Sequence, residues 1–285
     1  MQYFVENLVN IEINELIYLG WMDCPLEADN LLIAARLTDD EVSFPHESYN
    51  LEVGNEDAVG VWAKWRSKQI LRTLKQHGIK LLWEIGSGHG NVAIPLQSEG
   101  IAVIGIEPLV NGAKITAKSG VRTYLGTLES LRLPSNSISA IGIFDVLEHL
   151  EKPDLLLSEI YRVLRPGGLL LALVPAHQWL FSDFDKSIGH YRRYSRKVLY
   201  RQLKQSQFVN IKIEFMFSIF VLPALIIRKL PSLSRRPQNI KKTIKSSNIQ
   251  TRIINVFEPI IMPLLHLERK MHFPFGLSLF SISKK

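Results

Sequence analysis

Residues 81–90 read Leu81-Leu82-Trp83-Glu84-Ile85-Gly86-Ser87-Gly88-His89-Gly90, an apolar run that leads into a glycine-rich turn. A carboxylate lies near the end of the run, three glycines follow at alternate positions, and residues 91–96 then have a helical pattern. Glycines allow a turn to approach a ligand closely, and the first turn of a helix offers free N–H groups. The order predicts a buried strand, a tight turn and a helix start, as at the first strand of a nucleotide-type α/β fold.

Apolar runs alternate with helical patterns along most of the remaining chain. We expect strands at 80–85, 101–106, 121–125, 140–144, 169–174, 210–217 and 276–283. We expect helices at 59–77, 89–98, 109–118, 154–164 and 195–208, the last capped by Ser195. Strands that alternate with helices predict a largely parallel sheet covered on both faces, which is an α/β fold.

The composition indicates a globular protein with a sizeable core. The chain has 285 residues, of which 46% are hydrophobic, enough for one large domain with additions. The single cysteine, Cys24, excludes an intrachain disulfide and a cysteine-built zinc site. The first residues lack the pattern of a signal peptide, and the most apolar segment, 215–227, is shorter than the ~20 residues of a spanning helix. We therefore expect a cytoplasmic protein, either free or attached to the inner face of the membrane.

Positive charge is concentrated late in the chain. The net charge is +7, and residues 228–252 contain eight basic residues and no acidic one. We expect three parts: an N-terminal extension (1–58), a core (59–217 and 276–285), and an apolar and basic helical insertion (218–275). The insertion is either a lid on the core or a segment that contacts an anionic membrane surface. Nothing in it resembles an RNA-binding module, which argues against a nucleic-acid partner.

Glu107 ends the second expected strand, 21 residues after Gly86. A carboxylate at this place in the fold can accept hydrogen bonds from both ribose hydroxyls of a nucleoside. The alternative is a solvated acid at a strand end. A nicotinamide-dependent dehydrogenase also uses such an acid, but its fingerprint is Gly-x-Gly-x-x-Gly, and here the third glycine, Gly90, comes one position earlier.

Four motifs together resemble the class I S-adenosylmethionine-dependent methyltransferases. They are Trp83–Gly90, Glu107, Phe144-Asp145-Val146-Leu147-Glu148-His149-Leu150 and Arg162-Val163-Leu164-Arg165-Pro166-Gly167-Gly168. The segments Gly189-His190-Tyr191-Arg192-Arg193-Tyr194 and Phe273–Ser278 are similar to those of a bacterial-type subgroup, and the core is distantly similar to quinone-biosynthesis methyltransferases. The resemblance implies a Rossmann-like mixed sheet of seven strands with the last strand antiparallel. It also implies S-adenosylmethionine as methyl donor.

The resemblance also assigns cofactor-binding residues. Glu84, Gly86, Ser87, Gly88 and Gly90 would hold the methionine part, Glu107 the ribose, and Thr127 and Leu128 the adenine. Asp145 would face the methionine and the methyl group. The family often has an aspartate next to the adenine, and this sequence lacks it.

Methyl transfer needs a general base only if the acceptor must lose a proton. The candidates are His149, His177 and His190, each of which has a structural role as its alternative. Asp185 is a further candidate, unless it pairs with Arg192 or Arg193. Those two arginines and Tyr191 could instead bind an oxyanion of the acceptor, because a guanidinium suits bidentate contact. No metal site is expected.

We therefore expect methyl transfer, most simply to oxygen on a small-molecule or lipid-linked acceptor. The alternative from another class is a non-catalytic protein that binds S-adenosylmethionine or associates with a membrane partner. Formation of S-adenosylhomocysteine would separate the two.

Overall fold

The computed structural model describes residues 26–28, 30–33, 60–226 and 255–285. The strands are β1 (Leu26–Ala28), β2 (Leu31–Ile33), β3 (Leu81–Ile85), β4 (Ala102–Glu107), β5 (Arg122–Leu125), β6 (Ile138–Phe144), β7 (Leu164–Pro175), β8 (Val209–Met216) and β9 (Ser278–Lys284). The α-helices are α3 (Val61–Gln76), α4 (Ala93–Ser98), α5 (Val110–Lys118), α6 (Pro153–Val163), α7 (Asp183–Ser187), α8 (Arg196–Gln205), α9 (Val221–Ala224) and α12 (Glu258–Met271). Short 3₁₀ turns follow β6 (η2, Leu147–His149), β7 (η3, Gln178–Leu180) and β8 (η4, Ser218–Phe220).

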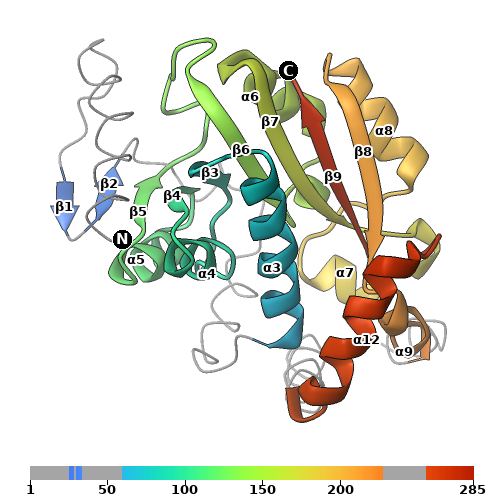
Figure 1. The fold of residues 1–285 in the computed structure, drawn as a ribbon. Coiled ribbons are helices and arrows are strands. Elements are labelled where there is room, and N and C mark those ends of the chain that lie inside the picture. The colour runs from blue at the N-terminus through green and yellow to red at the C-terminus, as the bar shows by residue number, and fades with distance from the viewer. Residues whose placement is uncertain (1–25, 29, 34–59, 227–254) are drawn as a thin grey trace.

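The described strands form one mixed sheet in the order β1-β2-β5-β4-β3-β6-β7-β9-β8. The five strands from β5 to β7 are parallel, and β9 runs antiparallel to both β7 and β8. This confirms the expected seven-stranded core with its antiparallel last strand (Figure 1). Two short strands extend it, because β2 adds in parallel to β5 and β1 pairs antiparallel with β2.

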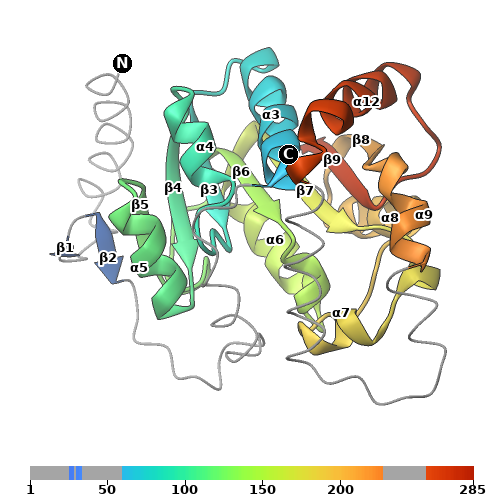
Figure 2. The same ribbon diagram turned by 90° about the horizontal axis from the view of Figure 1, so that it is seen from below.

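Helices cover both faces of the sheet (Figure 2). Neighbouring residues of β3 point to opposite faces: Leu82 packs in the apolar cluster under α3 and α4, and Trp83 packs in the cluster under α6 and α8. Every residue of β3 and β4 is buried. Such continuous burial is expected of parallel strands between two helical layers, and it explains their uninterrupted apolar runs.

The segment before the last strand contains a helix on the α3 side of the sheet. The ring of His266 on α12 packs edge-on against Trp65 of α3, and Lys64 pairs with Glu258. α12 (Glu258–Met271) lies within the insertion in which helical structure is expected from the sequence. Within the described ranges, no helix combines the length and the apolar character that crossing a membrane requires. The three-part domain division remains a prediction.

Candidate functional site

A cavity of about 890 Å³ lies beyond the carboxyl ends of β3, β4 and β6. This is the edge of an open α/β sheet where ligands bind, and the volume is within the roughly 300–1,000 Å³ of small-molecule sites. The lining includes the glycine turn after β3 and Glu107, and we call this part the cofactor end. It also includes residues of η2, α7, η4 and α9, and we call this part the acceptor end. The cavity thus has room for two reactants side by side.

The glycine turn is closed by packing that excludes side chains. Gly86 has φ +70°, and a Cβ there would collide with Cγ2 of Val146 in the loop after β6. Gly90 has φ +77° and would collide with Ile94. The backbone N–H of Gly88 donates to Oε2 of Glu107 at 2.7 Å, which joins the turn to the end of β4. The turn therefore presents bare backbone to the cavity, as the sequence predicted.

Two buried carboxyl groups face the cofactor end of the cavity. Burial raises the pKa of Glu84 to about 8; the Arg66 guanidinium lowers it and Glu107 raises it further. Burial also raises the pKa of Glu107 to about 7, opposed by hydrogen bonds from the N–H groups of Leu109 and Gly88. Oε2 of Glu84 has no hydrogen-bond partner among the described residues. A buried carboxyl oxygen without a partner costs free energy, so a cationic ligand such as an amino group fits beside it.

The expected adenine side is formed by a short turn after β5. Thr127 and Ser130 cap each other's backbone, with Ser130 Oγ accepting from the Thr127 N–H at 3.0 Å. Leu128 is buried, and both Thr127 and Leu128 line the cavity. No aspartate stands at this position, but the next residue along the chain, Glu129, also lines the cavity.

Asp145 is held in an unusual backbone conformation at the end of β6. Its φ is +56°, and its N–H donates to the carbonyl of Leu173 at 2.9 Å. The side chain forms an ion pair with Arg66 of α3, a buried arginine that also lines the cavity. Arg66 is not among the site residues expected from the sequence. The signal available was a basic residue on the apolar face of its helix, between Ala63 and Ile70.

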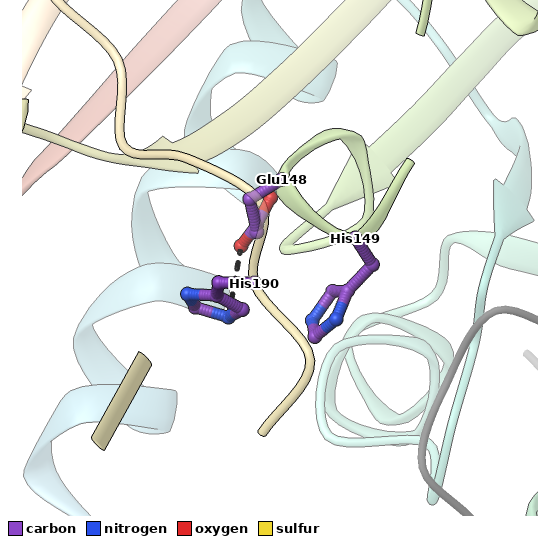
Figure 3. Close-up of side chains that lie close together, drawn as sticks. All are labelled: Glu148, His149 and His190. Atoms are coloured by element: carbon purple, nitrogen blue, oxygen red, sulfur yellow. Dashed lines mark ion pairs between the residues drawn. The ribbon is translucent and has the colours of Figure 1, made fainter. Parts of the chain in front are cut away.

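Glu148, His149 and His190, which all line the cavity, lie close together (Figure 3). Glu148 and His149 come from η2, and His190 comes from the segment after α7. Oε1 of Glu148 lies 3.9 Å from Nε2 of His190, and the rings of His149 and His190 meet edge-on at 4.5 Å. The three residues are of types that ligate metals, with the candidate ligand atoms all within 4.8 Å of one another. From the sequence no metal site is expected, and Glu148 has no assigned role.

Burial disfavours the charged forms of both Glu148 and His149. Burial, followed by the negative charge of Asp145, raises the pKa of Glu148 well above its usual range. Neither of its carboxyl oxygens has a hydrogen-bond partner in the described parts of the chain. Burial, followed by His190, lowers the pKa of His149 to about 3. A histidine with so low a pKa binds a proton weakly.

Asp185 holds His190 in place. Oδ1 of Asp185 lies 3.2 Å from Nδ1 of His190 and accepts from Nε of Arg193 at 2.8 Å. Oδ2 accepts from the N–H and the hydroxyl of Ser182 at 2.9 and 3.0 Å. Burial opposes ionisation, but His190 and Arg193 hold the pKa of Asp185 well below its usual range. The expected pairing of Asp185 with Arg193 is confirmed.

The remaining sequence candidates lie away from the cavity wall. His177 stacks on Phe215 with ring centroids 5.3 Å apart, and burial lowers its pKa. Tyr191 is half-exposed to solvent. Arg192 donates to the carbonyls of Leu150 and Glu151 at 3.0 and 2.7 Å. None of the three is among the residues that line the cavity, whereas His149, His190 and Arg193 are.

Apolar residues from the late part of the chain complete the acceptor end. Phe220, Pro223 and Ala224 of η4 and α9 line it. Trp62 of α3 also lines the cavity and stacks on Phe217 with centroids 3.6 Å apart. The wall beyond Asp145 is thus polar on the His190 side and apolar on the α9 side.

Comparison with known proteins identifies a methyltransferase domain in this region. Residues 83–172 match the methyltransferase domain family. An uncharacterized protein of Methanocaldococcus jannaschii is 28% identical over 155 residues, covering 51% of this chain and 73% of that protein. An uncharacterized methyltransferase of Mycobacterium sp. (strain JLS) is 30% identical over 131 residues, and the match covers 42% of this chain and 51% of that protein. The chain therefore spans about half the length of the mycobacterial relatives that it matches.

Solved structures share the fold. A SAM-dependent methyltransferase from Archaeoglobus fulgidus has a TM-score of 0.50 at 21% identity, covering 78% of this chain and 96% of that protein. Haemonchus contortus phosphoethanolamine N-methyltransferase 2, solved with phosphomonomethylethanolamine and S-adenosylhomocysteine, has a TM-score of 0.51 at 20% identity. That match covers 82% of this chain and 59% of the other.

Proposed function

We propose that this chain, which carries a class I S-adenosylmethionine-dependent methyltransferase domain and uses S-adenosylmethionine as donor, methylates an oxygen atom of an acceptor with a large apolar part. One observation carries the choice of oxygen. His190 lines the acceptor end of the cavity and is oriented there by Asp185. A positioned base is needed when the attacking atom must first lose a proton, as a hydroxyl must.

The donor would be held by the residues that the family resemblance assigns. They are Glu84, Gly86, Ser87, Gly88 and Gly90 for the methionine part, Glu107 for the ribose, Thr127 and Leu128 for the adenine, and Asp145 next to the methyl group. The unpartnered oxygen of Glu84 supports this placement, because an amino group would satisfy it. The bound donor supplies an electrophilic methyl group on a positively charged sulfur.

The hydrogen bonds around His190 favour it over the other candidate bases. An ionised Asp185 can only accept, so Nδ1 of His190 carries the proton that faces it. When the ring is neutral, Nε2 carries no proton and can take one from an acceptor; this atom lies 3.9 Å from Oε1 of Glu148. His149, with its pKa of about 3, has little affinity for a proton. Asp185 already accepts from His190, Arg193 and Ser182 through its two oxygens.

Proton and electron movements balance in one step. The hydroxyl proton of the acceptor passes to Nε2 of His190 as the oxygen bonds to the methyl carbon. The bond from carbon to sulfur breaks, and its electron pair stays on sulfur, which becomes a neutral thioether. Arg193 is a positioning residue in this scheme, because it contacts Asp185, which in turn orients His190.

The apolar wall favours an acceptor with a hydrocarbon part. Phe220, Pro223 and Ala224 are among the residues that line the acceptor end of the cavity. An acyl or isoprenoid chain buried there would fix the hydroxyl and exclude water from the reacting atoms. A lipid-linked acceptor is the class that this combination suits best.

Turnover to S-adenosylhomocysteine tests the proposal, with separate lipid and water-soluble cell extracts as acceptor sources. We expect His190→Gln to lower kcat by roughly 10²–10⁴-fold, the usual contribution of a general base. His177→Gln is the matched control outside the cavity and should retain kcat. Calorimetry with S-adenosylhomocysteine should give the wild-type affinity for both variants.

Three results would contradict the proposal. The first is unchanged kcat in His190→Gln. The second is turnover with water-soluble fractions and none with lipid fractions. The third is binding of S-adenosylhomocysteine without turnover in any fraction, which would indicate a non-catalytic cofactor-binding protein.

A further inference from the structure

The outer face of α12 carries a continuous row of exposed apolar side chains. Ile260, Leu264, Leu267 and Met271 follow one another at intervals of four, three and four residues, which places them on one side of the helix. Ile260 is 62% exposed and Met271 is 59% exposed. Val256 and Phe257, just before the helix, are also exposed. We call these six residues the α12 stripe.

The stripe points away from the body of the protein. The opposite side of α12 carries the buried Leu265 and the His266 ring that packs on Trp65 of α3. Four exposed apolar residues over three turns are too many for a solvated helix face, which is normally charged or polar. The stripe therefore requires an apolar partner.

Basic side chains lie on the other side of α12, where the helix faces α3. A depression between α3 and α12 is lined by Lys68, Arg72, Lys75 and Arg269, with no acidic residue among its lining residues. Lys75 also pairs with Glu99 at 3.5 Å. Lys270 lies exposed on α12 itself. Residues 228–252, which are outside the described part of the structure, contain eight basic residues and no acidic one.

A helix with an apolar row on one side and basic side chains on the other matches the chemistry of an anionic membrane surface. A helix of this kind lies in the plane of the interface, with its apolar side chains among the acyl chains and its cations near the lipid phosphates. A protein partner would have to offer both a hydrophobic groove and a row of acids. We propose that the α12 stripe docks this protein on the surface of an anionic bilayer.

The docked position would bring the cavity to the membrane. Asn255 lies directly before the stripe, and Pro223 and Ala224 belong to the short helix α9; all three residues line the cavity. On α9 itself, Leu222 is 64% exposed, and Ile226 just after it is 53% exposed. Figure 1 shows α9 next to α12 at one end of the molecule. An acceptor could then pass from the bilayer into the cavity along apolar surface.

Sedimentation of the full chain with vesicles tests the docking without any turnover. The vesicles contain phosphatidylcholine alone or phosphatidylcholine with about one third phosphatidylserine. We expect strong binding to the anionic vesicles and weak binding to the neutral ones, with the difference reduced by salt. A protein that does not sediment with vesicles would contradict the docking proposal and not the proposed methyl transfer. A protein without turnover would contradict the proposed methyl transfer and not the docking proposal.

Two variants separate the apolar and the electrostatic contributions to vesicle affinity. Leu264→Ser/Leu267→Ser/Met271→Ser should lower the affinity for anionic vesicles by at least about tenfold, because three inserting side chains are lost. Lys68→Gln/Arg72→Gln/Lys270→Gln should lower it by up to about fivefold for each residue near the surface, and should not affect binding to neutral vesicles.

A matched control carries the same chemical change on other surfaces. Val110→Ser/Leu155→Ser/Val198→Ser removes three exposed apolar side chains from α5, α6 and α8 and should bind vesicles as the wild type does. Binding of S-adenosylhomocysteine verifies that each variant is folded. The proposal is wrong if the wild type does not bind anionic vesicles, or if the triple variant Leu264→Ser/Leu267→Ser/Met271→Ser (the stripe variant) binds them with wild-type affinity. It is also wrong if light scattering shows a wild-type dimer that the stripe variant abolishes, because the stripe would then join two copies.

Discussion

The backbone N–H of Gly88 donates to Oε2 of Glu107 at 2.7 Å, and this bond ties the turn after β3 to the carboxylate that ends β4. The second carboxyl oxygen of Glu107 accepts from the N–H of Leu109 at 2.9 Å. Two backbone donors thus fix the side chain before any ligand arrives. Each carboxylate oxygen retains a further lone pair for a ribose hydroxyl.

Replacement of Glu107 tests the ribose assignment. Glu107→Ala should weaken binding of S-adenosylhomocysteine by ~1–3 kcal/mol, because two charge-assisted hydrogen bonds are lost. The milder Glu107→Gln keeps one oxygen acceptor and should lose less. Glu151→Gln, an exposed acid after η2, is the control. Equal affinities in calorimetry for Glu107→Ala and the wild type would refute the assignment.

Cofactor binding should release a proton. With a pKa of about 8, Glu84 is mostly protonated at pH 7, whereas pairing with an ammonium group requires its ionised form. Affinity for S-adenosylhomocysteine should therefore rise as the pH increases toward that pKa. Calorimetry in two buffers with different ionisation enthalpies would measure the released proton. Glu84→Gln should abolish most of the release, and an unchanged release in that variant would assign the proton to another group.

Arg66 of α3 interacts with two acidic residues that line the cavity, Asp145 and Glu84. It pairs with Asp145, and its charge lowers the pKa of Glu84. Arg66→Met should raise the pKa of Glu84 further, so the rise in cofactor affinity should move to higher pH. Arg72→Met, at an exposed position of the same helix, should leave the pH profile in place. If the two variants gave identical profiles, Arg66 would have no electrostatic role at the site.

Gly86 and Gly167 allow the cost of a left-handed backbone to be measured separately from the cost of a steric clash at Cβ. Gly86 and Gly167 both have positive φ, at +70° and +77°, but a Cβ meets Val146 at the first and nothing within 4 Å at the second. Both alanine variants should lose about 1–2 kcal/mol of unfolding free energy to the left-handed backbone. Gly86→Ala should lose more and also lose cofactor binding. Denaturant unfolding and calorimetry measure the two effects, and equal behaviour of the pair would argue against close packing at Gly86.

The core strands could be predicted from sequence because each carries its own signal. Apolar runs such as 101–106 are continuous when both faces are covered, and the glycine turn marks the strand that begins the site. The added strand β2 has no such signal, since its place is set by pairing Leu31 with Thr123 of β5. In the same way β7 begins at Leu164 instead of 169, because Leu164 pairs with Ile138 of β6 across the sheet.

The cofactor end of the site was more predictable than the acceptor end. Glu84 and Glu107 lie in motifs with fixed spacing, and the structure brings both to one cavity. The roles of the histidines depend on contacts between distant segments, such as His190 with Glu148 and Asp185. No spacing rule could show that His177 stacks on Phe215 or that Arg192 binds two backbone carbonyls. Arg66 was missed for the same reason, since its partner Asp145 is 79 residues away.

The destination of the methyl carbon is the most direct test of the proposed chemistry. The protein would be incubated with S-adenosylmethionine carrying a ¹³C-labelled methyl group and with a lipid extract, and the product examined by carbon NMR. We predict a single new signal at the chemical shift of a methyl group on oxygen, greatly reduced in His190→Gln. A methyl group found on nitrogen, carbon or sulfur, or an undiminished signal in that variant, would contradict the account.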